Sequence, residues 1–198
     1  MNTNGRNGTK PTITPPMSRE HYDRLRRAAN EKERLVIDFA AQTGARASEQ
    51  SRVRWRDVHF DNRTVRISNH EFGSTFRTVP ISSALCAVLA DHRQKSEFNS
   101  DDDFVFHTGR GTKARRPNLT GKRVLTANRF GEIHASAIEG GPSAPPIPAK
   151  PRWHDLRRFA IRSWFEAGLS LTTIAAFAGV SSAGAALLSG FDPDNHDD

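Results

Sequence analysis

Cysteine is almost absent from this chain, since Cys86 is the only one among 198 residues. A single cysteine excludes a framework of disulfides within the chain and favours a reducing compartment. Cys86 sits in the apolar run ALCAVLA, where a cysteine more often packs as a small buried hydrophobic group than reacts. We therefore expect a cytoplasmic protein with an ordinary apolar core.

Long apolar runs are also lacking. No stretch approaches the roughly 18 apolar residues that a membrane-spanning helix needs, so no membrane partner is expected. The first residues, MNTNGRNGTKPTITPP, are polar and lack the apolar centre of a secretory signal. We expect residues 1–15 to form a flexible polar lead, residues 16–191 to form one domain, and residues 192–198 to form an acidic tail.

Acidic residues are outnumbered by basic ones, at 22 against 29, which gives a formal net charge of +7. Four of the acidic residues fall in the last seven positions, so the rest of the chain is more basic still: Asp192, Asp194, Asp197 and Asp198. Most of the basic residues are arginines, whose guanidinium group can bind two phosphate oxygens at once. This balance indicates a polyanionic partner, most simply nucleic acid; a basic surface kept for solubility is the alternative.

Hydrophobic periodicity predicts helices on both sides of a short β region. Residues 18–29 and 31–42 show helical spacing, with Ser18 as a possible N-cap and Thr43-Gly44 as a break. Further helices are expected over residues 46–54, 83–95, 122–138, 154–168, 171–179 and 181–190. Strands are expected over 58–68, with a turn at Asp61-Asn62, and over 76–82, and residues 101–108 look extended. The fold class is therefore mostly α, mixed α+β: a helical bundle with a small antiparallel sheet.

Three stretches in this order resemble the catalytic domain of the tyrosine recombinases, the phage integrase family. Residues 43–67 read TGARASEQSRVRWRDVHFDNRTVRI and resemble the family's first catalytic box. Residues 76–82, FRTVPIS, resemble the strand that leaves its β-hairpin, and residues 154–182, which begin HDLRR, resemble its His-x-x-Arg box. The likeness covers about residues 15–191. It implies an integrase-like catalytic domain whose partner is double-stranded DNA, with no metal, cofactor or small-molecule substrate.

The resemblance also bears on assembly. Family members usually work as tetramers, which leaves other recombinase protomers as further candidate partners. They usually carry a separate helical DNA-clamping domain before the catalytic domain. Only about 16 residues precede the first predicted helix here, so we expect that domain to be missing from this chain.

Arg46, His154 and Arg157 match the residues with which the family holds a DNA phosphate. In the family's reaction a tyrosine attacks a phosphodiester, and two arginines stabilise the charge that develops on the phosphorus oxygens. The resemblance assigns that part to Arg46 and Arg157, and assigns hydrogen bonding or proton transfer to His154. Glu49 is expected to be the structural partner of a nearby arginine. Other basic residues expected to contact DNA are Arg77, Arg115, Arg116, Lys122 and Arg158.

Three groups that the family uses for cleavage are lacking. The hairpin SNHEFGSTFRTVP contains no lysine to act as general acid, and His70 is its only candidate for proton transfer. Val180 replaces a histidine or tryptophan and has no hydrogen-bonding group. The position of the nucleophilic tyrosine falls on Ser189 by direct counting, or on Phe191 with a two-residue insertion.

The chain's only tyrosine, Tyr22, lies near the other end and is expected to pack on the first helix. Ser189 has no evident base to activate it. We therefore expect a DNA-binding, integrase-like protein, associated with the nucleoid through DNA, that is unable to cleave DNA. Two alternatives stay open. One is an active strand transferase whose nucleophile is unusual or supplied in trans. The other is a module that binds a full-length recombinase.

Overall fold

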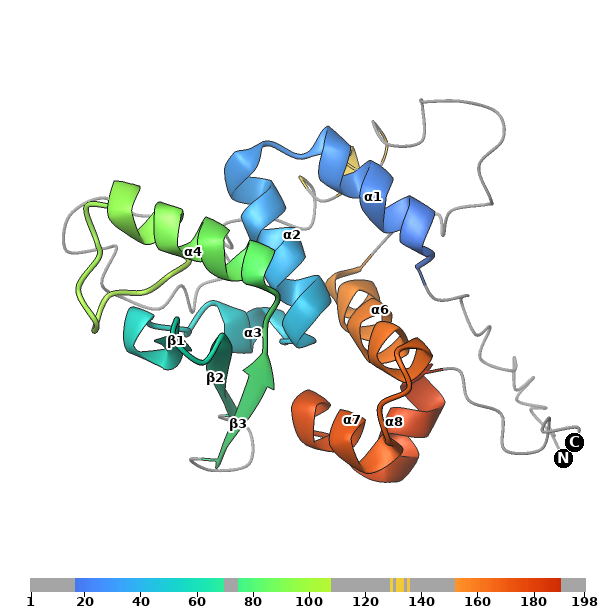
Figure 1. Cartoon of the computed structure of the whole chain (residues 1–198). Helices are drawn as coiled ribbons and strands as arrows, with labels where there is room; N and C mark the ends of the chain where they lie inside the picture. The colour runs from blue at the N-terminus through green and yellow to red at the C-terminus, as the bar shows by residue number, and fades with distance from the viewer. Residues whose placement is uncertain are drawn as a thin grey trace, which may run out of the picture.

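The computed structural model describes residues 17–69, 75–107, 129, 131–133, 135 and 152–189, in which a small sheet lies at one side of a group of helices (Figure 1). The helices are α1 Arg19–Ala28, α2 Glu31–Thr43, α3 Ala47–Gln50, α4 Ser83–Lys95, α6 Trp153–Glu166, α7 Leu171–Ala178 and α8 Ser182–Ser189. The strands are β1 Val58–His59, β2 Thr64–Asn69 and β3 Thr75–Pro80, preceded by a short 3-10 turn, Trp55–Asp57. The predicted fold class is confirmed.

The ends of the first two helices follow local sequence signals. The Ser18 hydroxyl caps α1 by accepting the His21 N–H. At the start of α2, Asn30 and Glu33 each accept the other's main-chain N–H, which forms a capping box. Gly44 ends α2 with a φ of 61°, and a Cβ on it would lie 3.2 Å from the Trp164 ring. Glycine therefore both permits the left-handed turn and lets α6 approach this end of α2.

The sheet is antiparallel in the order β1-β2-β3, with Val65 opposite Val79 and Ile67 opposite Arg77. Because side chains on a strand alternate between its two faces, Arg77 shares the inward face with Val79. Val65, Ile67 and Val79 are fully buried. The inward face of the sheet therefore carries one arginine among apolar side chains.

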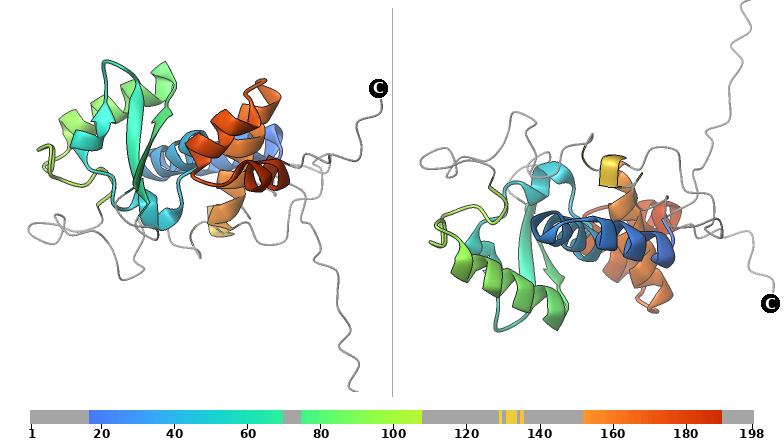
Figure 2. Two further views of the ribbon diagram at one scale, coloured as in Figure 1. Left: turned by 90° about the horizontal axis from the view of Figure 1, so that it is seen from below. Right: turned by 90° about the horizontal axis from the view of Figure 1, so that it is seen from above.

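α2 lies at the centre of the molecule, between the sheet with α4 on one side and α6–α8 on the other (Figure 2). The main hydrophobic cluster spans α1, α2, α4, the sheet and α6, and its largest side chains include Trp55, Phe39, Leu25, Ile37 and Leu156. A second, smaller cluster joins α6 to α7 and α8 through Ile161, Ile174, Ala175, Ala178 and Ala185. Of the aromatic side chains of α6, Phe159 is buried and Trp153, Trp164 and Phe165 are partly buried.

Some predicted boundaries were wrong. The helix expected over 46–54 is the single turn α3, because Val53 and Trp55 are buried in the core, with Arg54 between them in extended backbone and Trp55 at the start of the 3-10 turn. Arg54 pairs across an isolated bridge with Phe104, so the expected extension of 101–108 amounts to that bridge within residues 101–107. Cys86 is half-buried rather than fully buried.

Several expectations concern residues that are described only in part or not at all. In the predicted helix 122–138, residues 129, 131–133 and 135 are helical and the others lie outside the described residues. The N-terminal lead and the acidic tail also lie outside them. Among the described residues, no single helix is long and apolar enough to cross a membrane; α7 and Ser182–Leu188, bent by 91°, meet that test only as a pair.

Candidate functional site

The three residues expected to bind phosphate meet where the end of α2 packs against the start of α6. Arg46 follows the Gly44 turn and precedes α3. His154 and Arg157 lie in the first half of α6, three residues apart. Nη1 of Arg157 donates to the Gly44 carbonyl at 2.6 Å, which joins the two segments directly. The structure therefore brings Arg46, His154 and Arg157 together.

Arg157 is almost completely enclosed, with a relative exposure of 1%. Besides the Gly44 carbonyl, it binds the Ala178 carbonyl at the end of α7 through Nη2, at 2.6 Å. Burial, together with the charges of Arg46 and Arg77, lowers the pKa of Arg157 to about 10. The guanidinium still carries its proton at neutral pH and links α2, α6 and α7.

Glu49 holds Arg46 in place. Nη1 of Arg46 lies 2.8 Å from Glu49 Oε1, and the Arg46 main-chain N–H donates to Oε2 at 2.7 Å. Arg77 pairs with the same carboxylate through Nη1 at 3.0 Å and Nη2 at 2.7 Å. Burial raises the pKa of Glu49, but the hydrogen bonds and charge of Arg77, with those of Arg46, outweigh it and the net pKa is lowered. The expectation that Glu49 is a structural partner of an arginine is confirmed.

His154 is exposed at the edge of this cluster. Partial burial lowers its pKa, and the charge of Arg157 lowers it further, so the imidazole is neutral at pH 7. Arg158 also lies close enough to contribute to that lowering. Its Nε is buried and has no hydrogen-bond partner among the described residues. The positive charge of the site therefore comes from its guanidinium groups.

The remaining predicted site residues are placed unevenly. Arg77 lies inside the molecule, with 8% of its side chain exposed. Val180 follows the end of α7 and packs, partly buried, against the second cluster. Ser189 is the last residue of α8, but its side chain lies outside the described residues, as do the following residues in full: His70, Arg115, Arg116, Lys122 and Phe191.

Tyr22, the chain's only tyrosine, is held within the core by α1. Its hydroxyl donates to Asp38 Oδ1 at 2.7 Å, and its ring stacks on Phe159 with centroids 4.7 Å apart. Burial raises the pKa of Tyr22, and the Asp38 carboxylate raises it further. A phenol that donates to a carboxylate and resists ionisation is a poor nucleophile. The expectation that Tyr22 packs on the first helix is confirmed.

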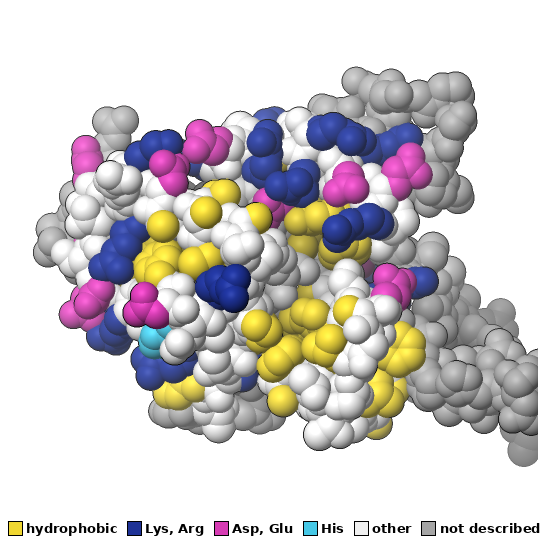
Figure 3. Space-filling view, viewed as in Figure 1, with side chains coloured by type: hydrophobic (Ala, Val, Ile, Leu, Met, Phe, Trp, Pro, Cys, Tyr) yellow, Lys and Arg dark blue, Asp and Glu magenta, His cyan; other side chains and the backbone are white. Residues whose placement is uncertain are grey.

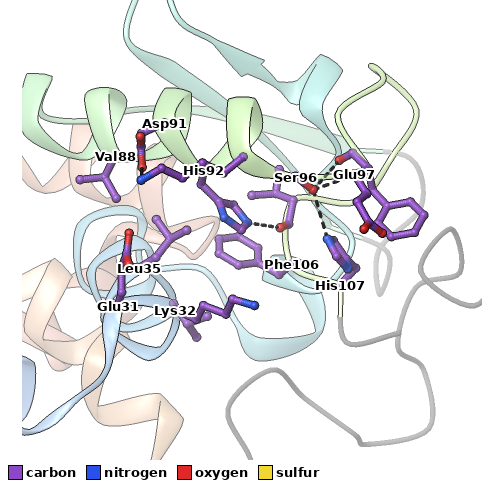
Figure 4. Close-up of a pocket in the computed structure, with 14 residues that line it drawn as sticks. Glu31, Lys32, Leu35, Val88, Asp91, His92, Ser96, Glu97, Phe106 and His107 are labelled. Carbon is purple, nitrogen blue, oxygen red and sulfur yellow. Dashed lines mark hydrogen bonds and ion pairs between the residues drawn. The ribbon is translucent and has the colours of Figure 1, made fainter. Parts of the chain in front are cut away.

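A cavity of about 450 Å³ lies elsewhere, between α2, α4 and residues 105–107 (Figure 4). His92 Nε2 lies 3.2 Å from the Val105 carbonyl oxygen, and His107 Nε2 lies 3.4 Å from Ser96 Oγ. The cavity shares no lining residue with the Arg46 site. Within the ranges that the structure describes, no group of three or more His, Cys, Asp or Glu side chains is placed to hold a metal ion.

The face seen in Figure 3 carries no continuous basic patch. Lysine and arginine are interspersed with aspartate and glutamate over its upper part, while hydrophobic side chains gather toward α6 and α7.

The contacts of Arg77 with Glu49 and with the end of α7 were not predicted from the sequence. One signal was available, because Arg77 lies two residues before the buried Val79 and so shares the inward face of β3.

A model of the phage integrase family matches residues 16–185. No curated protein matches the chain. Among the solved structures that share the fold is a crystal structure of XerA recombinase: 19% identity, TM-score 0.70, covering 93% of this chain and 63% of that chain. Another is the Tn1549 transposon integrase in complex with a circular intermediate DNA. Its identity is 14% and its TM-score 0.67, and the match covers 91% of this chain and 62% of that chain.

A third is a lambda integrase dimer bound to a COC' core site, with 16% identity and a TM-score of 0.66, covering 98% of this chain and 65% of that chain. This chain therefore spans less than two thirds of the length of each of the three structures. At these identities the likeness is one of fold alone. The family model, by contrast, matches most of the chain by its sequence, and the chain belongs to the phage integrase family, the tyrosine recombinases.

Proposed function

We propose that this domain binds the phosphate backbone of double-stranded DNA at Arg46 and His154, with the charge of the buried Arg157 beside them, and that it does not cleave the DNA itself. The observation that carries the proposal is the convergence of the two arginines with His154 at the junction of α2 and α6. Two of the similar structures are complexes, one of lambda integrase bound to a core site and one of the Tn1549 integrase with a circular intermediate DNA. The family supplies the class of process, DNA recombination.

The charge of the site supports an anionic ligand. Arg46, Arg77 and Arg157 lie close enough to influence one another, and Glu49 pairs with Arg46 and Arg77. Arg158 adds a further cation beside His154. Since the cations exceed the carboxylates, a phosphate group would be attracted to the exposed edge of the cluster. Arg46, with 28% of its side chain exposed, is the cation best placed to meet it first.

Three features support the loss of cleavage. The only tyrosine of the chain is fixed by Asp38 and Phe159 within the core. Val180 offers no hydrogen bond to a phosphate oxygen. The hairpin residues 68–80 contain no lysine to protonate a leaving oxygen. Groups that act as a catalytic unit lose almost all activity when the nucleophile is removed. The remaining arginines and His154 would bind and polarise a phosphate without breaking the ester.

A second candidate function is strand transfer with a tyrosine supplied by another protomer. The lambda integrase structure on its core site is a dimer, which supports a second protomer as a partner of this chain. A third is a module that binds a full-length recombinase and has little affinity of its own for DNA. Both alternatives predict a result that differs from the first, so a single set of samples can separate the three.

The test measures affinity for duplex DNA across a salt series for wild type, Arg46→Ala and His154→Ala. We expect wild-type affinity to fall steeply with salt, and Arg46→Ala to weaken binding about tenfold and reduce the salt slope by about 1, as the loss of one phosphate contact requires. Arg162→Ala is the control, because Arg162 lies on α6 with His154 but pairs with Glu166. Arg157 is left intact, since its removal would disturb the fold.

The same samples are run on a denaturing gel, with and without a full-length recombinase. No covalent protein–DNA adduct is expected from this chain. An adduct formed by the chain alone would overturn the proposal, whereas strand cleavage seen only in the mixture would favour a nucleophile supplied in trans. If the wild type binds no DNA, or if Arg162→Ala weakens binding as much as Arg46→Ala, the assigned site is wrong.

A further inference from the structure

Arg77 reaches from β3 to two other parts of the molecule. Its Nη1 and Nη2 bind the two oxygens of Glu49 on α3, and its Nε donates to the Phe177 carbonyl of α7 at 2.8 Å. Only 8% of the side chain is exposed. All three nitrogens of the guanidinium are therefore engaged inside the protein, and the group joins β3, α3 and α7 at one point.

The end of α7 explains why an arginine is useful there. The last carbonyls of a helix have no partner within it. At this end the Phe177 carbonyl is bound by Arg77, and the next one, of Ala178, is bound by Arg157 at 2.6 Å. Two guanidinium groups, from β3 and α6, thus cap consecutive carbonyls. Gly179 leaves room for this approach, because a Cβ there would lie 3.3 Å from both Cδ and Nη1 of Arg77.

The same side chain is connected to the exposed part of the site. Glu49 Oε1 lies 2.8 Å from Nη1 of Arg46 and 3.0 Å from Nη1 of Arg77, so one buried carboxylate oxygen serves both arginines. If Arg77 leaves, Glu49 loses two of its donors and is free to turn. The position of Arg46, and the position of α7 relative to it, therefore both depend on Arg77.

We propose that Arg77 is a positioning residue, which fixes Arg46 and the α7–α8 pair relative to each other and does not contact DNA. The proposal rests on the proposed function only in taking Arg46 as a phosphate ligand. A residue that contacts phosphate acts through its charge, which lysine retains. A residue that acts here must bind a carboxylate and a main-chain carbonyl at once, and the fork geometry needed for that belongs to arginine alone.

The experiment compares Arg77→Lys and Arg77→Met with wild type, first without DNA. Hydrogen–deuterium exchange is followed in the amides of α7 and α8. Both variants are expected to exchange about tenfold faster there or more, because charge-assisted hydrogen bonds to the end of α7 are lost. The controls are Arg66→Lys and Arg66→Met. Arg66 lies on the adjacent strand and pairs with Asp57, so its variants should leave α7 and α8 unchanged.

DNA affinity is then measured for the same proteins. We expect Arg77→Lys to lose as much affinity as Arg77→Met, about tenfold, through displacement of Arg46. Exchange like wild type in α7 and α8, or full affinity in Arg77→Lys beside a loss in Arg77→Met, would overturn the proposal. If Arg77→Met does not fold, Arg77→Lys alone decides. If wild type binds no DNA, the proposed function fails, but the exchange result still tests the position of α7 and α8.

Discussion

The two hydrophobic clusters of this domain are stabilised in different ways. The main cluster buries large side chains from five parts of the chain, and Trp55, Phe39 and Leu25 are at most 1% exposed. The cluster of α6, α7 and α8 is small, and three of its five buried members are alanines: Ala175, Ala178 and Ala185. Burial of an alanine removes little apolar area from water, so the second cluster gains much less from the hydrophobic effect.

The smaller cluster is held instead by polar bonds of fixed direction. Arg77 and Arg157 are buried and donate to the last carbonyls of α7. The hydrophobic effect has no preferred direction, whereas a guanidinium fork that binds defined oxygens sets both distance and angle. The main cluster therefore supplies most of the stability, and the arginines determine where α7 and α8 lie beside Arg46.

Of the changes to these arginine–carbonyl hydrogen bonds, replacement of Arg157 should lower the stability most. Arg157→Met retains much of the side-chain volume but leaves the Gly44 and Ala178 carbonyls without their donor. We expect the free energy of unfolding to fall by about 3 kcal/mol. Chemical denaturation measures it. The reference is Phe39→Ala, which opens a cavity in the main cluster and should cost about 4 kcal/mol.

The distribution of the damage separates the two variants. Phe39→Ala should weaken protection from hydrogen exchange throughout the domain, whereas Arg157→Met should weaken it most in α7 and α8. If Arg157→Met lies within about 0.5 kcal/mol of wild type, the value typical of surface changes, the arginine does not stabilise the end of α7. Equal loss of protection everywhere would show instead that the two clusters unfold as one unit.

Much of the fold follows from local signals, and the difference between the clusters explains where they end. Ser18 and the left-handed Gly44 and Gly179 mark helix ends that depend on neighbouring residues only. The turn at Asp61-Asn62 does the same for the hairpin. The helix expected over 46–54 was wrong because Val53 and Trp55 are buried in the core, and this tertiary packing outweighs helical propensity.

The site is predictable in its members but not in their partners. Arg46, His154 and Arg157 were placed by motif, and the structure brings them together. The partners of Arg157 lie 113 and 21 residues away in the chain and are main-chain carbonyls, which carry no sequence signature. For the same reason the contact of Arg77 with Phe177 was not foreseen. That Arg77 contacts DNA was predicted from its charge, and burial of its side chain is the factor that charge leaves out.

The pH dependence of stability tests the contribution of the Glu49 carboxylate, which pairs with Arg46 and Arg77. The folded state lowers the pKa of Glu49 from its ordinary value of 4.5. A carboxylate whose pKa is lowered on folding stabilises the protein above its unfolded pKa, and this contribution is lost as pH falls through the folded pKa. We expect Glu49→Gln to be less stable than wild type at pH 7 by about 2 kcal/mol, and the difference to shrink below pH 4.5.

Chemical denaturation of both proteins at pH 7 and at steps below pH 4.5 measures this difference. The pKa of Glu33 is also lowered in the fold, but Glu33 is present in both proteins and cancels. A difference that stays constant with pH would mean that the Glu49 carboxylate gains nothing from ionisation in the fold. The neutral amide would then serve Arg46 and Arg77 equally well.

The smallest expected effect compares two glycines that share a backbone conformation but differ in surroundings. Gly168 and Gly179 both have positive φ, 83° and 65°. Alanine in this region costs about 1 kcal/mol at either position. A Cβ at Gly168 meets nothing within 4 Å, whereas at Gly179 it meets Arg77 at 3.3 Å. We therefore expect Gly179→Ala to lose several tenths of a kcal/mol more than Gly168→Ala, because only it displaces the guanidinium.

Chemical denaturation gives the two losses in the free energy of unfolding, and hydrogen exchange locates them. Faster exchange at the end of α7 in Gly179→Ala, with α7 unchanged in Gly168→Ala, would show that Arg77 has little freedom to move. Equal losses and equal exchange would show that Arg77 shifts by a few tenths of an ångström without breaking its bonds. In that case the hydrogen bonds of Arg77 to α7 adapt as readily as the apolar packing of the main cluster. The two clusters would then differ in how much they stabilise the fold rather than in how precisely they position its helices.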